Sequence, residues 1–287
     1  MAFNFQTFKT RAITAIVFVI AMLVGLLWNQ WSFLTLFFII NLGCWIEYQK
    51  LMGLIDNDYS LLNSFHRYSI ILAGTGLLLL MTNNDYSIGG LLVNKMGWWF
   101  FLVGLVIFVF SGLLTFKKTN FRLLLYSVAG LFYISLSWAL MMRLWGNLDQ
   151  TVFVGENWIV AIVLIASILI NDTMAYLVGS IIGKTPLSAV SPKKTWEGTI
   201  GGAILAVLTV VLIGYFIYQF PIKPLILISL CAAISGTIGD LLESKLKRIA
   251  GVKDSGNLMP GHGGLLDRFD SLLIATTTVW FVLHLFY

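Results

Sequence analysis

Charge is scarce in this chain of 287 residues, because Asp, Glu, Lys and Arg make up 11% of it while 59% is hydrophobic. Soluble domains carry about 25% charged residues, so this composition excludes an ordinary soluble globular protein. Cysteine is scarce too, since Cys44 and Cys231 are the only two and both lie within apolar segments. This usage argues against a disulfide framework and against a zinc site. The remaining interpretation is a polytopic membrane protein.

No small-residue cleavage site follows the first apolar segment, and no long polar linker interrupts the chain. We therefore expect that segment to stay in the membrane as a helix. The sequence predicts an all-α, polytopic integral membrane protein with about nine transmembrane helices, each near the roughly 20 apolar residues that a bilayer requires. The candidate spans lie near residues 12–28, 32–49, 68–82, 96–116, 121–143, 158–181, 199–220, 224–244 and 271–287.

Lysine and arginine are distributed unevenly among the predicted loops. With the N-terminus in the cytoplasm, fifteen of the eighteen fall on the cytoplasmic side, and Lys95, Arg143 and Lys223 fall on the other. This asymmetry follows the positive-inside rule, and it accounts for the net charge of +5 without a nucleic-acid partner. We expect a multi-pass protein of the cell inner (cytoplasmic) membrane. Residues 1–150 would hold about five spans, and residues 151–287 a catalytic region that faces the cytoplasm.

The sequence NDTMAY, which begins at Asn171, places a carboxylate inside an otherwise apolar span. Such a carboxylate costs roughly 2.5 kcal/mol or more at a helix centre, so Asp172 is a functional candidate. The alternative is that Asp172 only hydrogen-bonds a neighbouring helix. Asp172, Tyr176, Gly179 and Gly183 share one helix face, where small glycines would let a second helix or a ligand approach closely.

The sequence SPKKTWEG, residues 191–198, is a polar loop before a span. Its side chains Ser191, Lys193 and Lys194 could hold phosphate oxygens, and the lysines could equally meet anionic lipid head groups. Glu197 is expected near the start of the next helix, where a carboxylate is favourable. The nearby GKT at residues 183–185 is not a P-loop, because the required glycine spacing is absent and a helix precedes it.

The sequence GDLLESKLKR, residues 239–248, carries Asp240, Glu243 and Lys247 on one helix face. A face with two carboxylates and a lysine can hold a divalent ion and contact a phosphate. The alternative is a helix at the membrane surface whose charges pair with one another.

The sequence KDSGNLMPGHGGLLDRFD, residues 253–270, holds five charges, a histidine and four glycines between two apolar runs. Its glycines allow close approach of the backbone to a ligand, and exposed N–H groups there can bind an anion. Asp267 and Asp270 follow as the last span begins. Hard oxygen ligands of this kind suit Mg²⁺, which is usually held by one or two carboxylates plus substrate phosphates.

These four polar segments supply carboxylates, cations and a glycine-rich turn at one face of the membrane. Such groups suit phosphoryl or nucleotidyl transfer, in which catalysis is mostly positioning and neutralisation of charge. A protease is less expected, because no Ser-His-Asp arrangement is evident nearby. Composition and spacing do not name the substrate.

The run SKLKRIAGVKDSGNLMPGHGGLLDRFD, from Ser244 to Asp270, resembles the signature of the CDP-diacylglycerol synthase, or phosphatidate cytidylyltransferase, family. The upstream runs NDTMAYLVGSIIGK and SPKKTWEG resemble the same family in the expected order, so the resemblance covers about residues 165–275 in detail. It implies transfer of CMP from CTP to phosphatidic acid, giving CDP-diacylglycerol and pyrophosphate in phospholipid biosynthesis, with Mg²⁺ as cofactor.

The resemblance also implies roles for individual residues. Asp240 and Asp267 would bind Mg²⁺ and, with Lys247, would form the catalytic group. The residues expected to contact the substrates or shape the nucleotide pocket are Lys193, Lys194, Ser191, Arg248, Lys253, His262, Gly263, Arg268 and Asp172. The partners implied are CTP, phosphatidic acid and the lipid bilayer, and the glycines and apolar surface permit a homodimer.

Two other functions remain open. A related CTP-dependent lipid kinase of the polyprenol or phytol type would use similar phosphate-binding groups but would release CDP instead of pyrophosphate. A transporter or ion channel would use carboxylates within the membrane. Transporters often show paired repeats, however, and no internal repeat is visible in this sequence.

Overall fold

The computed structural model describes residues 5–114, 121–146, 152–153, 158–256 and 263–287, and most of them are helical. This confirms the predicted all-α fold. In chain order the helices are α1 (Phe5–Leu27), α2 (Gln30–Ile55), α3 (Asn57–Ser60), α4 (Ser64–Leu80), α5 (Val93–Leu114), α6 (Phe121–Gly130), the π-helix η1 (Leu131–Ser135), α7 (Leu136–Gly146), α8 (Ile159–Ile182), α9 (Trp196–Phe216), α10 (Ile222–Ile249) and α11 (Leu266–Phe286).

Seven helical segments of the described chain are long and apolar enough to cross a membrane. They comprise α2, α5, the continuous rod from α6 to α7, and each helix from α8 to α11. The chain is therefore a multi-pass integral membrane protein. Two further apolar helices, Ile13–Leu27 and Ser64–Leu80, are shorter. They coincide with the first and third predicted spans, but they are shorter than the other seven. The count of nine spans and the cytoplasmic N-terminus therefore stay predictions.

The chain divides into two compact units. Unit 1 comprises Met1–Ala139 and Ile249–Phe269, and unit 2 comprises Leu140–Arg248 and Asp270–Tyr287. Unit 1 therefore contains helices of the N-terminal half together with a short segment from near the C-terminus. This division reflects which residues pack together in space, and it carries no information on function. The predicted catalytic region at residues 151–287 therefore stays a prediction.

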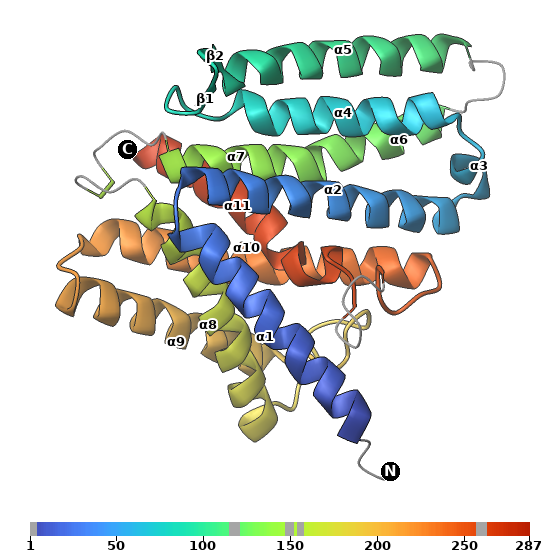
Figure 1. The fold of residues 1–287 in the computed structure, drawn as a ribbon. Coiled ribbons are helices and arrows are strands. Elements are labelled where there is room, and N and C mark those ends of the chain that lie inside the picture. Colours follow the sequence, from blue (N-terminus) through green and yellow to red (C-terminus); the bar gives the residue numbers. More distant parts are fainter. Residues whose placement is uncertain (1–4, 115–120, 147–151, 154–157, 257–262) are drawn as a thin grey trace. The chain divides into compact units, whose positions relative to one another are not determined.

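In unit 1, α4 and α5 lie side by side (Figure 1). Glycines allow this close packing, because a Cβ atom at Gly104 would meet the backbone of Ala73. The sheet within the described residues is a small hairpin of β1 (Ser87–Ile88) and β2 (Leu91–Leu92). Gly89 and Gly90 join its strands with φ values of 58° and 84°, which is the conformation that two-residue hairpin turns require.

In unit 2, α8 and α9 pack along each other. A Cβ atom at Gly202 in α9 would lie 2.7 Å from Cα and Cβ of Ala175 in α8, and one at Gly198 in α9 would lie 2.9 Å from Cα of Gly179 in α8. Only glycine fits such a close approach. The predicted glycine face of α8 is thus the face that a second helix approaches.

Candidate active site

A pocket of about 460 Å³ in unit 2 brings together the predicted polar segments of α8, the 191–198 loop and α10. It lies where the last turns of α8 meet the first turn of α9 and the middle of α10. The polar side chains that line it are Asn171, Asp172, Tyr176, Ser180, Ser191, Lys193, Lys194, Thr195, Thr199, Thr237 and Asp240. Five of the residues predicted from sequence, Asp172, Ser191, Lys193, Lys194 and Asp240, are therefore neighbours.

Asp172 lines this pocket with its side chain exposed, while the preceding Asn171 is buried. The Asn171 amide donates a long hydrogen bond of 3.4 Å from Nδ2 to Oδ1 of Asp172. Its own Oδ1 has no hydrogen-bond partner among the described residues. Asp172 thus presents its carboxylate to the pocket, where a bound cation or a donor on a ligand could contact it, whereas Oδ1 of Asn171 is buried.

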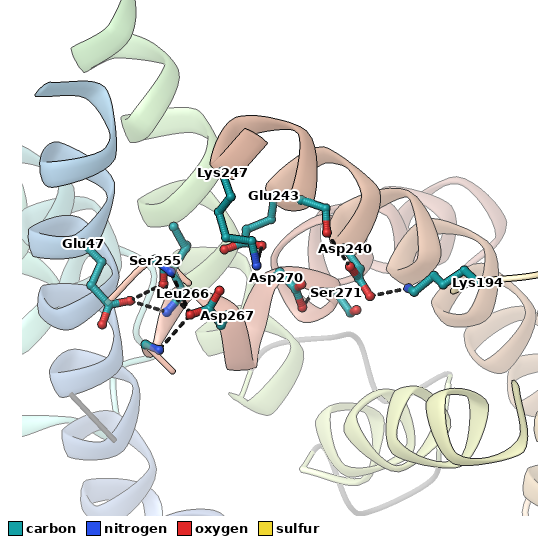
Figure 2. A network of polar contacts seen from close by, with 12 residues as sticks. Glu47, Lys194, Asp240, Glu243, Lys247, Ser255, Leu266, Asp267, Asp270 and Ser271 are labelled. Carbon is teal, nitrogen blue, oxygen red and sulfur yellow. Dashed lines mark hydrogen bonds and ion pairs between the residues drawn. The ribbon is translucent and has the colours of Figure 1, made fainter. Parts of the chain in front are cut away.

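Asp240 pairs with Lys194 across the pocket (Figure 2). The Ser244 hydroxyl, one turn further along α10, also donates to Oδ1 of Asp240 at 3.2 Å. Both partners of the ion pair are partly exposed, at 30% for Lys194 and 27% for Asp240. The pair is therefore open to the pocket, where the lysine can turn to an anionic ligand.

The loop that carries Lys194 is fixed from both sides. Its backbone is paired with the preceding segment, since Leu187 N–H donates to the Lys194 carbonyl at 2.8 Å and Trp196 N–H donates to Thr185 at 2.9 Å. Glu197, in the first turn of α9, accepts hydrogen bonds from the backbone N–H groups of Lys184 and Thr185 and from the Thr185 hydroxyl, at 2.8 to 3.2 Å. The GKT sequence therefore anchors this loop through Glu197.

The predicted polar face of α10 also carries, beyond Asp240, Glu243 and Lys247, which form an ion pair one turn apart. Glu243 is fully buried, and 12% of the Lys247 side chain is exposed. Asp240, Lys247 and Lys194 are the charged groups that act on the buried carboxylate of Asp270, at the start of α11 in the same unit. Lys247 thus belongs to a charged cluster but does not line the pocket.

The donor atoms in unit 2 suit a hard divalent metal. Asp172 and Asp270 form no ion pair with any cation of the described chain, so this cluster has two carboxyl groups that its lysines do not pair. Within the described ranges, no three His, Cys, Asp or Glu side chains converge as a complete metal cage. Mg²⁺ needs no such cage, because it usually takes one or two carboxylates together with substrate phosphates and water.

Asp267 and the remaining predicted residues near it belong to unit 1. Oδ2 of Asp267 accepts hydrogen bonds from the backbone N–H and hydroxyl of Ser255, both at 2.9 Å, and from Gly264 N–H at 2.7 Å. Gly263 has a φ of 87°, which favours glycine. The Gly264 N–H thus serves an internal bond, and an anion would have to use other donors of this turn.

Lys253, Arg268 and, in unit 2, Arg248 are exposed cations outside the pocket lining. His262 lies outside the described residues. The predicted roles of all four therefore stay predictions.

Glu47 is a residue that the sequence analysis missed. It lies in α2 and is only 7% exposed. Its carboxylate accepts hydrogen bonds from the Ser255 hydroxyl and from the backbone N–H groups of Leu265 and Leu266, all in unit 1 (Figure 2). The signal was present, because a carboxylate inside an apolar span is as costly at Glu47 as at Asp172. Its partners are more than 200 positions away along the chain, so spacing could not identify them.

The comparisons with known proteins all indicate the same family. The model of the cytidylyltransferase family matches residues 9–286. A phosphatidate cytidylyltransferase of Bacillus subtilis is 48% identical over 119 residues, which are 40% of this chain and 44% of that protein. One of Staphylococcus haemolyticus is 45% identical over 106 residues, 36% of this chain and 41% of that protein.

A plant relative matches as well. Phosphatidate cytidylyltransferase 4, chloroplastic, of Arabidopsis thaliana is 44% identical over 109 residues, 38% of this chain and 28% of that protein. The matched segments span less than half the length of each of these three relatives. The family model, in contrast, covers nearly the whole chain. The chain therefore belongs to the cytidylyltransferase family, as the resemblance in its sequence predicted.

Proposed function

We propose that this chain is a nucleotidyltransferase that transfers CMP from CTP to phosphatidic acid, giving CDP-diacylglycerol and pyrophosphate. The observation that carries the proposal is the pocket of unit 2, where Lys193 and Lys194 lie beside Asp172 and Asp240 on membrane-spanning helices. Membership of the cytidylyltransferase family and the names of the relatives support the choice of substrates.

The reaction needs little covalent participation by the protein. A phosphate oxygen of phosphatidic acid attacks the α-phosphorus of CTP and forms a new P–O bond. The bond from the α-phosphorus to the oxygen that bridges to the β-phosphate breaks, and pyrophosphate leaves with that electron pair. Lys193 and Lys194 offset the negative charge of the phosphates. The lipid phosphate is already anionic near neutral pH, so no general base is required.

Mg²⁺ is the metal that we propose for this reaction, in which it would neutralise and orient the triphosphate. The resemblance implies that Asp240 and Asp267 would be its ligands, and Asp172, in the same pocket as Asp240, would offer an additional oxygen donor. Lys247, Arg248, Lys253 and Arg268 are proposed as further contacts to phosphate groups. Ser191, which lines the same pocket, is proposed to donate a hydrogen bond to a substrate.

The proposed setting is the inner membrane of the cell, with the pocket open to the cytoplasm. CTP is soluble and anionic, whereas phosphatidic acid stays in the bilayer. A pocket between spanning helices and a polar loop suits both substrates, because the loop lysines can meet CTP while the lipid remains in the membrane.

The direct test supplies purified protein with phosphatidic acid, Mg²⁺ and CTP labelled at the α-phosphate. We expect CDP-diacylglycerol and pyrophosphate in equal amounts, and no product when Mg²⁺ is removed with a chelator. In a parallel reaction that supplies a polyprenol or phytol in place of phosphatidic acid, release of CDP with the phosphorylated alcohol would instead support the lipid-kinase alternative. Absence of any CDP-lipid, while a relative assayed in parallel is active, would overturn the proposal.

A further inference from the structure

Glu47 caps the start of a helix that lies far from it in sequence. Its Oε1 accepts the N–H of Leu265 at 3.0 Å, and its Oε2 accepts the N–H of Leu266 at 2.8 Å. The first N–H groups of a helix have no partner within the helix itself, and a negative charge there is stabilised by the helix dipole. Glu47 therefore provides α11 with a cap from another helix.

A serine hydroxyl links this cap to Asp267. Oγ of Ser255 lies 2.8 Å from Oε2 of Glu47 and 2.9 Å from Oδ2 of Asp267. A serine hydroxyl has a single hydrogen, so at any moment Ser255 donates to one of the two carboxylates. The position of the Asp267 carboxylate is thus coupled to that of Glu47 through one shared group.

The segment around these contacts leaves no room for other side chains. A Cβ atom at Gly256 or at Gly264 would collide with the Glu47 carboxylate. Gly43, one turn before Glu47 in α2, similarly lies against the Leu265 side chain. Residues 43 and 47 share one face of α2. This face contacts the segment that leads into α11. We call residues 255–256 and 263–267 the α11 lead-in segment.

We propose that Glu47 is a positioning residue that holds the α11 lead-in segment and, through Ser255, orients Asp267. The effect on catalysis rests on the proposed function, in which Asp267 is a ligand of Mg²⁺. Groups that orient metal ligands from outside the ligand set commonly affect metal affinity or activity by about 10- to 100-fold. Glu47 is such a group, because it lies outside the proposed ligand set and orients the proposed ligand Asp267.

The first experiment compares the wild type with Glu47→Gln, which keeps the size of the side chain but removes its charge and one acceptor oxygen. We expect kcat to fall and the Mg²⁺ concentration for half-maximal rate to rise, each by about 10-fold or more. Ser255→Ala should shift the Mg²⁺ dependence in the same direction, because it removes only the hydroxyl that joins the two carboxylates. Glu47→Asp should recover part of the wild-type dependence, since it restores the charge.

Gln49→Ala is the matched control for a merely structural effect. Gln49 is also buried in α2, at 4% exposed, but its Nε2 donates to the carbonyl of Arg67 at 2.8 Å and not to the lead-in segment. This variant should lower the melting temperature about as much as Glu47→Gln does. It should leave the Mg²⁺ dependence at its wild-type value.

Hydrogen exchange of the backbone amides gives a readout that does not depend on turnover. In the Mg²⁺-free protein, Glu47→Gln should speed exchange at residues 264–267, and Gln49→Ala should not. Unchanged exchange and unchanged Mg²⁺ dependence in Glu47→Gln, or the same changes in Gln49→Ala, would overturn the inference while the proposed function stands. A wild type that makes no CDP-lipid would overturn the proposed function and the catalytic part of the inference, and the exchange data would still decide whether Glu47 orders the segment.

Discussion

Asp172 and Asp240 project from different helices into one pocket, but only Asp240 forms an ion pair with a described residue. An unpaired carboxylate among membrane helices is costly, and a bound cation removes that cost. Lys194 meanwhile shares the pocket with both carboxylates. The pocket therefore holds the two kinds of group that a metal–nucleotide complex needs. The carboxylates supply oxygen ligands for the metal, and the lysine supplies a cation for the phosphates.

Asp240→Asn and Asp267→Asn should each lower the rate of CDP-lipid formation by about 100-fold or more, because each removes a proposed charged ligand of Mg²⁺. Asp58→Asn is the control, since Asp58 is an exposed carboxylate in the short helix α3. Initial rates and melting temperatures of the three variants should be measured together. A near-wild-type rate for either of the first two would show that the metal assignment is wrong.

At the level of single residues, the sequence identified several residues that line the pocket, but not Thr199 or Thr237 there, and not the residue that caps α11. Asp172, Tyr176 and Gly179 were found because helical spacing places them on one face, and the structure places Tyr176 and Gly179 in the same pocket as Asp172. The contact of Glu47 with Leu266 joins positions 219 apart. No local pattern encodes such a pair, because folding alone brings its members together.

At the level of elements, every predicted span corresponds to a helix, but the ends differ where capping groups decide them. The last span was expected from residue 271, and α11 begins at Leu266 because Glu47 accepts hydrogen bonds from the N–H groups of Leu265 and Leu266. The expected span at 121–143 contains the π-helical turn Leu131–Ser135. There the Ser135 hydroxyl accepts a hydrogen bond from the Trp45 indole at 2.7 Å. Hydropathy alone carries no signal for either feature.

The 183–196 loop is the element that we expect to control binding of CTP, because it carries Lys193 and Lys194. Glu197→Ala would remove the hydrogen bonds that the Glu197 carboxylate accepts from the Lys184–Thr185 segment, and would leave the bond from Trp196 N–H to the Thr185 carbonyl. We expect KM for CTP to rise about tenfold, or ~1.4 kcal/mol of binding free energy, with a smaller change in kcat. Steady-state kinetics at saturating phosphatidic acid would measure this.

Thr185→Val is the matched control for this loop, because it removes the hydroxyl donor at 2.8 Å and keeps both backbone N–H donors to Glu197. Its KM should lie between those of the wild type and Glu197→Ala. If Glu197→Ala bound CTP as tightly as the wild type, the loop would not depend on this anchor, and the backbone pairing of Lys194 with Leu187 and its ion pair with Asp240 would suffice to position it.

At the level of the whole molecule, orientation in the membrane decides whether the pocket can reach CTP. The distribution of Lys and Arg predicts that the loop at 183–196 is cytoplasmic and that the hairpin near residue 87 lies on the opposite side. Three spans separate these two segments, namely α5, the α6–α7 rod and α8. An odd number of crossings must place them on opposite sides, so the predicted orientation and the span count can be tested together.

Single cysteines at exposed positions make that test, and we expect Ser87→Cys to react and Ala189→Cys to be protected in right-side-out vesicles treated with a membrane-impermeant maleimide. Both positions are exposed, and replacing Cys44 and Cys231 by alanine removes the native thiols. Detergent should make both sites reactive, which controls for local accessibility. The reverse pattern would place the pocket on the wrong side for CTP. Labelling of both sites from outside would mean that an even number of spans lies between them, so that one of the three helical segments does not cross.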